Sequence, residues 1–414
     1  MGQELGWAPA TEAYLWGYPL LAVHRTQQLL CSRNPPGELH HLPELATPKD
    51  RAVVVPNNDT LYSSGWFDLR YGDLTIEVPP MDHPGRYWNV MVVDAYTGVH
   101  YLRRKTWGTD GLRARVSFDP QAGDRGDDPG LLRLPTATAW VIARVLVESP
   151  DDLPTAQALQ QAFRVDAPKA HSRALTARGG RPAALGEAGV GFFHELKQAL
   201  LRDPSPKGYP SLSPAASALL ESLEGQDEAR LLAGLAEGEQ LLKAGRGGDD
   251  RVVRGWRSGR AAGGPGQDVL RRALGAKYGL GGHYALENRS YTALGDAQGQ
   301  PLDGRRPLRL RFPKGGLPPC SGFWSLTAYG PDLYLVENAL KRYALGDRTP
   351  GLRYDADGGL SLELSAAPPR QRENWLPVPP GPYLLGLRVY EGDPSVVDCA
   401  WFPPSLEPQE SEAP

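Results

Sequence analysis

The sequence has few cysteines and no long apolar run. Its three cysteines, Cys31, Cys320 and Cys399, lie far apart, which argues against a disulfide framework and against a zinc site. No stretch reaches the roughly 18 apolar residues that a membrane-spanning helix requires. The apolar stretch from Ala13 to Val23 follows no basic residue and has no clear cleavage signal, unlike a secretion leader. We therefore expect a soluble protein of the cytoplasm with reduced thiols.

An excess of positive charge is also absent. The chain has 45 Lys and Arg residues against 48 Asp and Glu residues, which gives a net charge of −3. Nucleic acids and anionic membrane surfaces attract proteins through clustered positive charge. We therefore expect neither nucleic acid nor a membrane as a partner.

The chain is long and rich in residues that favour turns. Its 414 residues exceed one ordinary domain, which predicts two or three domains. The 48 glycines and 40 prolines stay below the share that marks collagen-like or disordered chains. Such a composition favours short strands connected by tight turns.

The pattern of apolar residues divides the chain into three parts. Helical spacing from Pro9 to Leu30, followed by short strand-like runs, predicts an N-terminal helix and β domain over residues 1–150. Residues 151–276 are rich in Ala, Leu, Glu and Arg and predict a helical connection, with a loop or hinge from Gly245 to Gly266. Strand-like runs return over residues 277–414. We predict a mainly β, α+β protein with two antiparallel β-sandwich or jelly-roll-like domains.

Several cofactor and metal motifs fail at the residues that they require. Gly279, Gly281 and Gly282 form part of a dinucleotide-binding pattern, but Tyr284 stands where the full spacing needs glycine. The eight histidines show no ligand-type spacing with one another. We therefore predict no cofactor and no local metal site. A metal held by ligands from separate strands stays open as an alternative.

The densest polar segment runs from Pro56 to Asp68, directly after a strand-like run. Short amide and carboxylate side chains often fix turns by bonding to nearby backbone, so one interpretation is a structural turn. The functional alternative is that Asn58, Asp59 and Tyr62 converge at the mouth of the sandwich. Asp59 would then act as a general base or orient a ligand hydroxyl, and Trp66 would contact the substrate.

The second cluster lies on and after the strand-like run from Arg86 to Asp94. Alternate side chains of a strand share a face, so Arg86, Trp88 and Asp94 point to one side. The opposite side holds Tyr87, Asn89, Met91 and Val93. Arg86 and Asp94 are either two ends of a pocket floor or strand-end charges beside a core stripe. Trp88 and Tyr96 are candidate binding residues, and His100 is a candidate acid or base.

The third cluster lies in the predicted C-terminal domain. Trp324, Tyr329 and Trp375 combine large apolar rings with one polar atom each. Such side chains suit a sandwich core, and they also suit the stacking of a substrate ring or a sugar. Both interpretations stay open.

Taken together, short segments of the three clusters resemble a known bacterial family. These segments are Asn57-Asn58-Asp59-Thr60-Leu61-Tyr62-Ser63, Phe323-Trp324-Ser325-Leu326-Thr327 and Asn374-Trp375-Leu376-Pro377. The family pairs the domain of unknown function numbered 1254 at the N-terminus with the one numbered 1214 at the C-terminus. The resemblance implies an N-terminal β domain, a helical connection and a C-terminal jelly-roll-like domain. It implies no particular chemistry.

The leading functional hypothesis is an enzyme of specialised metabolism that works without a cofactor. It would cyclise, isomerise or hydrate a small apolar molecule in an aromatic-lined pocket. The candidate catalytic residues are Asp59, Tyr62, Arg86, Asp94 and His100. The alternatives are a non-catalytic carbohydrate- or ligand-binding protein and a metal-dependent enzyme. Self-association as a homodimer also stays open.

Overall fold

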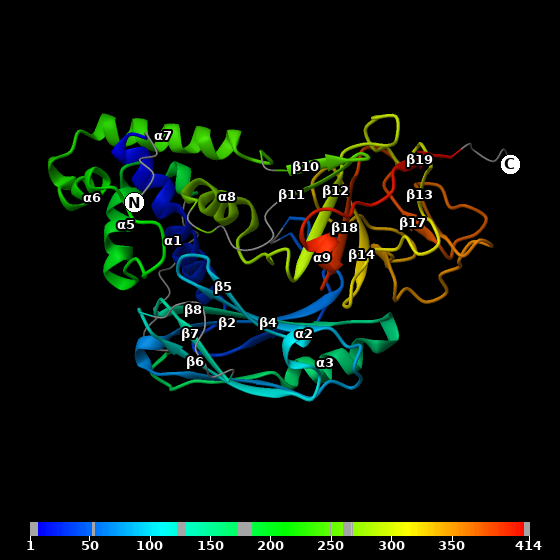
Figure 1. Cartoon of the computed structure of the whole chain (residues 1–414), viewed down its shortest axis with the longest axis horizontal. Coiled ribbons are helices and arrows are strands. Elements are labelled where there is room, and N and C mark those ends of the chain that lie inside the picture. The colour runs from blue at the N-terminus through cyan, green and yellow to red at the C-terminus, as the bar shows by residue number, and fades with distance from the viewer. Residues whose placement is uncertain are drawn as a thin grey trace.

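The computed structural model describes residues 7–51, 54–121, 130–171, 184–248, 250–259, 266 and 268–409. The structure has 27% helix and 28% strand, arranged in two sheet-rich domains and a helical part. Figure 1 shows the N-terminal sheets at the bottom, with the helices at the upper left and the C-terminal sheets at the upper right. The predicted fold class is therefore confirmed.

The N-terminal domain consists of two packed sheets. Sheet I has the strand order β1 (His40–Leu42), β2 (Thr60–Asp68), β8 (Thr138–Leu146), β4 (Trp88–Asp94) and β5 (Val99–Arg103). Sheet II has the order β7 (Leu131–Leu134), β6 (Leu112–Phe118), β3 (Leu74–Val78) and β9 (Arg164–Asp166). Short helices α2 (Arg104–Trp107) and α3 (Leu153–Ala162) complete it.

Sheet I buries different kinds of side chain on its two faces. The face toward sheet II carries alternating apolar residues, among them Leu61, Val90, Val92 and Val141, which form one core with sheet II. The opposite face is covered by helix α1 at one end and by the C-terminal domain at the other. Polar side chains of this second face are therefore enclosed between parts of the chain that are distant in sequence.

The helical part has a core of its own. Its helices are α1 (Pro9–Cys31), α5 (Gly191–Arg202), α6 (Pro214–Glu221), α7 (Glu228–Ala244) and α8 (Val269–Gly279). Their N-termini carry ordinary start signals, because Pro9 opens α1 while Asp227 and Asp268 cap α7 and α8. Helix α1 thus packs against helices that begin more than a hundred residues later in the chain.

The C-terminal domain also consists of two sheets around one apolar core. Sheet III has the order β10 (Asp250–Val253), β11 (Trp256–Gly259), β12 (Asn288–Ala293), β18 (Leu384–Tyr390), β14 (Trp324–Tyr329) and β15 (Ala344–Gly346). Sheet IV has the order β17 (Trp375–Pro377), β16 (Leu360–Ser365), β13 (Leu308–Phe312) and β19 (Leu406–Pro408). Helix α9 (Pro394–Val397) lies beside them. Most pairs are antiparallel, but β6–β7 and β16–β17 are parallel.

Sheet membership extends both β domains into the predicted helical connection. Strand β9 lies in sheet II, and the segment expected as a loop or hinge contains β10 and β11 of sheet III. Within that segment, residues 249, 260–265 and 267 lie outside the described part of the chain. No helix among the described residues is long and apolar enough to cross a membrane.

Candidate functional site

A row of polar side chains crosses sheet I on the face away from sheet II. Tyr62 on β2 pairs with Arg144 on β8, Arg144 pairs with Asn89 on β4, and Asn89 pairs with Arg103 on β5. Directly paired residues point to the same side of a sheet, so four strands contribute one polar row. Asn89 is fully buried and Arg144 is 4% exposed. Polar groups at such depth need partners, which come from outside the sheet.

The segment before β12 supplies two titratable partners for this row. Glu287 accepts hydrogen bonds from the Tyr87 hydroxyl at 2.6 Å, from Asn89 Nδ2 at 3.3 Å and from Arg103 at 3.1 Å. His283 Nε2 lies 3.5 Å from Asn89 Nδ2, while His283 Nδ1 lies 3.3 Å from the Tyr101 hydroxyl. Asn89 therefore stands between the carboxylate and the imidazole.

The C-terminal domain closes the site with Tyr390. Its hydroxyl accepts a hydrogen bond from Asn57 Nδ2 at 2.6 Å, and its ring meets Tyr87 edge to face at 5.2 Å. The same ring also lies nearly perpendicular to the imidazole of His283, with 6.1 Å between the ring centres. We call these residues the interdomain cluster: Tyr62, Tyr87, Asn89, Tyr101, Arg103, Arg144, His283, Glu287 and Tyr390.

The surroundings shift the two titratable groups in opposite directions. Burial lowers the pKa of His283 well below its usual 6.5, and the nearby charge of Arg144 lowers it further. Burial raises the pKa of Glu287 above its usual 4.5, although Tyr87 and Arg103 oppose that shift. His283 is therefore neutral near pH 7. Paired groups with opposite shifts are a frequent feature of acid–base sites.

The hydrogen-bond partners of His283 assign its tautomer. Asn89 presents an amino group toward Nε2, and the Tyr101 hydroxyl faces Nδ1. This pattern suits a proton on Nδ1 and a lone pair on Nε2. His283, Tyr62 and Tyr101 keep partial solvent exposure, unlike the buried Asn89 and Glu287. The lone pair at Nε2 thus faces Asn89 Nδ2 at 3.5 Å.

Three of the residues predicted from the sequence lie at the contact between the two β domains. Tyr62 belongs to the interdomain cluster, and the Arg144 guanidinium lies 4.8 Å over its ring. Asp59 is fully buried and pairs with Arg348 of the C-terminal domain. Tyr329 accepts a hydrogen bond from Arg388 at 2.6 Å and donates one to the Pro56 carbonyl at 2.8 Å.

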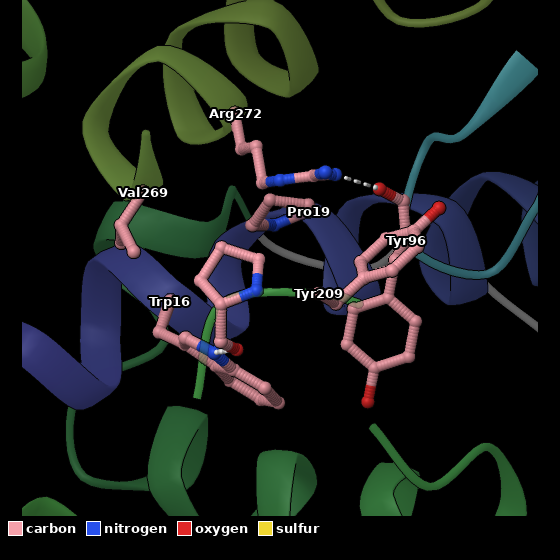
Figure 2. Close-up of a pocket in the computed structure, with 7 residues that line it drawn as sticks. Trp16, Pro19, Tyr96, Tyr209, Val269 and Arg272 are labelled. Carbon is pink, nitrogen blue, oxygen red and sulfur yellow. Dashed lines mark hydrogen bonds between the residues drawn. The ribbon is translucent and has the colours of Figure 1, made fainter. Parts of the chain in front are cut away.

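Another group of predicted residues lies beside a small cavity between helices α1 and α8 and the turn after β4. Figure 2 shows this cavity, lined by Trp16, Tyr96, Tyr209 and Arg272 together with Pro19, Pro210 and Val269. The Arg272 guanidinium lies 4.3 Å over the Tyr209 ring and donates to the Tyr96 carbonyl, the contact drawn as a dashed line. The cavity has a volume of about 10 Å³, which is roughly what one water molecule needs. The cavity therefore does not hold a substrate in this conformation.

Asp94 and His100 lie next to this cavity. Asp94 accepts hydrogen bonds from the backbone of Tyr96 and Gly98 at 2.8 Å and from the Tyr209 hydroxyl. His100 Nε2 lies 3.7 Å from the Asp94 carboxylate. Asp94 thus holds the turn between β4 and β5, and the fully buried carboxylate has its contacts there.

The other predicted residues lie apart from both places. Arg86 pairs with Asp82 at 2.6 Å and Asp152 at 2.8 Å, and Asn58 donates to the Ala46 carbonyl. Trp66 stacks on Trp140 beneath helix α1. Trp88 and Trp324 lie in two separate apolar cores, one in each β domain. The structure does not bring Arg86 and Asp94 together as one pocket floor.

Trp375 lines a larger cavity on the C-terminal domain. The cavity measures about 360 Å³, and polar residues Glu337, Asn338 and Arg372 line it together with several prolines. Trp375 itself is buried and donates its indole N–H to the Ser365 carbonyl at 3.0 Å. A volume of this size lies within the range of small-molecule sites.

The sequence does not identify four central members of the interdomain cluster as site residues: Asn89, Arg144, His283 and Glu287. Strand alternation predicts the face of Asn89, opposite Trp88, but predicts no role for it. A signal for Arg144 existed, because an arginine inside an otherwise apolar strand is unusual unless it has buried partners. His283 and Glu287 lie in a loop where no local pattern marks them.

Metal binding has no obvious place in the part of the chain that the structure describes. No group of three or more His, Cys, Asp or Glu side chains is positioned there to hold a metal ion. The interdomain cluster itself offers one imidazole and one carboxylate, and the carboxylate already contacts Tyr87, Asn89 and Arg103.

Two sequence families match the chain. Residues 36–167 match a family described as "Protein of unknown function (DUF1254)", and residues 287–394 match one described as "Protein of unknown function (DUF1214)". The order confirms the resemblance indicated by the sequence motifs. The first range spans sheets I and II. The interdomain cluster therefore combines residues of both matched ranges with His283, which lies between them.

One solved structure extends the likeness to the whole chain. The VPA0106 protein from Vibrio parahaemolyticus is similar over 97% of this chain and 99% of its own, with a TM-score of 0.69 and 22% identity. An uncharacterised protein from Burkholderia cenocepacia is similar over 96% and 88%, with a TM-score of 0.47 and 11% identity. No curated protein matches the chain. The likeness to the Vibrio protein shows a shared fold.

Proposed function

We propose that the chain is an enzyme of specialised metabolism that isomerises, cyclises or hydrates a small organic molecule by acid–base chemistry at the interdomain cluster. No redox cofactor takes part in this proposal. His283 would take a proton from the substrate at Nε2 and return it at a neighbouring position. Glu287 would act as a positioning residue, since it holds Asn89 and Tyr87 against the imidazole.

The observation that carries the proposal is the neutral imidazole of His283 beside a buried, hydrogen-bonded carboxylate. A general base must be unprotonated at the working pH and must have a lone pair that can reach the substrate proton. Both conditions are supported by the lowered pKa of His283, its partial exposure and the weak 3.5 Å contact at Nε2. The rings of Tyr62, Tyr101 and Tyr390 add apolar surface against which a substrate can be oriented.

Solvent deuterium exchange tests this proposal without knowledge of the product. The protein would be incubated in deuterated water with a panel of small ketones and carboxylic acids, and deuterium on carbon would be read by mass spectrometry. We expect the wild type to exchange at least one panel compound. His283→Asn should slow that exchange about a hundredfold or more, the usual contribution of a general base.

His194→Asn is the matched control, because His194 lies exposed on helix α5. It should exchange the same compound at the wild-type rate. Equal rates for His283→Asn and the wild type would contradict the assignment, and the absence of exchange across the panel would count against proton abstraction at carbon.

The pH profile gives a second readout. Because the pKa of His283 lies well below 6.5, the base is fully unprotonated above that pH. Protonation of His283 should therefore not change the exchange rate above pH 6.5. It should lower the rate only at more acidic pH. A rise of the rate through pH 6.5 would indicate a different base.

A second candidate function is the binding of a ligand without catalysis, and the C-terminal cavity of about 360 Å³ favours it. Its lining combines Trp375 with Asn338 and Arg372, which suits a sugar or another polar ring compound. Thermal-shift screening against sugars, metal ions and hydrophobic polycyclic compounds separates the candidates, because a bound ligand stabilises the folded chain. Stabilisation by sugars alone would favour the binding protein.

A further inference from the structure

We propose that the interdomain cluster binds a small carboxylate between the guanidinium of Arg144 and the imidazole of His283. This inference deepens the proposed function, on which it rests, by naming the substrate class as an organic acid with an aromatic or apolar body. The evidence comes from the hydrogen bonds and the missing counter-ion of Arg144.

Arg144 is a buried cation without a carboxylate partner. It donates to Asn89 Oδ1 at 3.4 Å and to the Gly281 carbonyl at 3.2 Å, while its Nε has no hydrogen-bond partner. Among the described residues, no carboxylate lies within ion-pairing distance of Arg144, and only 4% of the residue is exposed. An uncompensated buried charge is costly, so the folded chain carries a positive charge that an anion would neutralise.

The buried arginines of this chain find partners in more than one way. Arg86, which is 1% exposed, pairs with Asp82 and Asp152. Arg104 at the same domain contact pairs with Glu391. In the part of the chain that the structure describes, Arg289 and Arg388 are buried without a carboxylate partner, as Arg144 is, but each of them donates three hydrogen bonds. Arg144 donates two, at 3.4 and 3.2 Å, and is therefore the least satisfied of these buried guanidinium groups.

The surroundings of Arg144 favour a carboxylate over other anions. One carboxylate balances one guanidinium and matches its planar donors, whereas a phosphate brings more charge and more acceptors than these donors satisfy. The rings of Tyr62 and Tyr101 lie beside the site, and both residues are half-buried, as is His283. These rings can pack against the organic body of the acid, while its charged end meets Arg144.

Isothermal titration calorimetry with benzoate on the full chain tests the inference. Benzamide has the same shape without the charge, and inorganic phosphate tests a different anion. We expect benzoate to bind the wild type more tightly than either. Arg144→Gln should weaken benzoate at least about tenfold, because a charge-assisted hydrogen bond is lost.

Arg251→Gln is the matched control. Arg251 donates to the Cys399 carbonyl at 2.8 Å and lies 5.6 Å from the Phe402 ring centre, so it has the same kinds of contact far from the cluster. It should bind benzoate as the wild type does. Equal benzoate affinity of the wild type and Arg144→Gln would overturn the inference, and so would equal binding of benzamide.

Two further measurements test the inference even if Arg144→Gln fails to fold. Arg144→Lys keeps the charge but loses the forked donors, so it should bind benzoate with an affinity between those of the wild type and Arg144→Gln. In the wild type, benzoate next to the imidazole should raise the pKa of His283, measured from its ring protons by NMR. An unchanged pKa in the presence of saturating benzoate would contradict a site between these two residues.

The two proposals fail in different ways. If benzoate binding depends on Arg144 but no panel compound exchanges deuterium, the anion site is supported and the proposed enzyme activity is contradicted. If deuterium exchange depends on His283 but carboxylate binding does not depend on Arg144, the enzyme activity is supported and the proposed substrate class is contradicted.

Discussion

At the scale of single residues, Glu287 shows how one buried carboxylate can organise a site at a cost in stability. It accepts hydrogen bonds from Tyr87, Asn89 and Arg103, yet burial still dominates and raises its pKa. A carboxyl with a raised pKa binds more protons in the folded chain than in the unfolded chain between the two pKa values. The free energy of unfolding therefore falls as the pH rises through that interval.

Glu287→Gln removes this titration while it keeps the size of the side chain. The unfolding free energy of the wild type minus that of the variant should therefore fall as the pH rises from 4.5 and then become constant above the raised pKa. Urea unfolding of both proteins from pH 4.5 to about 8 measures this difference in unfolding free energy. Glu224→Gln, at an exposed carboxylate, provides the control, and its difference from the wild type should change far less. A difference that grows with pH would mean that Arg103 and Tyr87 outweigh burial.

Residue identity alone could not have predicted this site. Asp59, Tyr62, Asp94 and His100 have suitable chemistry in sequence, but only Tyr62 joins the interdomain cluster. Asp94 holds a turn, and Asp59 pairs with Arg348. Such roles depend on which side chains arrive from distant parts of the chain.

At the scale of elements, helices α1 and α7 approach closely because glycines face α1. A Cβ added at Gly234 would lie 2.4 Å from the Cβ of Ala10 and 2.8 Å from the backbone nitrogen of Thr11. A Cβ at Gly238 would lie 2.3 Å from the Tyr14 ring. These two glycines, four residues apart on one helix face, set the distance between the helices.

Gly234→Ala should therefore destabilise the protein by about 1–3 kcal/mol, although alanine is the better helix former, because backbone must move to admit the methyl group. Gly275 on helix α8 is the matched control, since nothing lies within 4 Å of an added Cβ. Gly275→Ala should stabilise by about 0.5–1 kcal/mol. Chemical unfolding of both variants measures the contrast. A stabilised Gly234→Ala would show that the helices can separate at little cost.

The elements themselves were partly predictable. The alternation from Arg86 to Asp94 correctly assigned Trp88 to one face and Asn89 to the other, because strand geometry is local. The polar residues from Pro56 to Asp68 favour a turn or a site, yet Thr60–Asp68 forms the nine-residue strand β2. Its polar side chains are acceptable there because other parts of the chain cover sheet I.

At the scale of the whole molecule, the polar row of sheet I becomes a site only through strand order and domain packing. Tyr62, Arg144, Asn89 and Arg103 come from strands that pair in the order β2, β8, β4, β5, which no local pattern encodes. The sequence predicted two β domains and a helical part, but not the face on which they meet. The aromatic contact between Tyr87, Phe323 and Tyr390 fixes that face.

Phe323 makes the contact between the two β domains testable. Its ring stacks on Tyr390 at 4.2 Å and meets Tyr87 of the N-terminal domain at 5.3 Å, and the Arg348 guanidinium lies 4.6 Å over it. Phe323→Ala should cost about 3–5 kcal/mol, as for other buried phenylalanines. Because its partners belong to both domains, we expect faster amide hydrogen exchange in β4 as well as in β18.

Phe312→Ala is the matched control, because Phe312 is equally buried but lies inside the C-terminal core against Trp324. Its loss of stability should be similar, while amide exchange in β4 should stay at the wild-type rate. Mass spectrometry of exchanged peptides distinguishes the two variants under native conditions. If Phe323→Ala leaves β4 unchanged, the domains open independently of this aromatic contact. The interdomain cluster would then need another element to hold Glu287 and Tyr390 against sheet I.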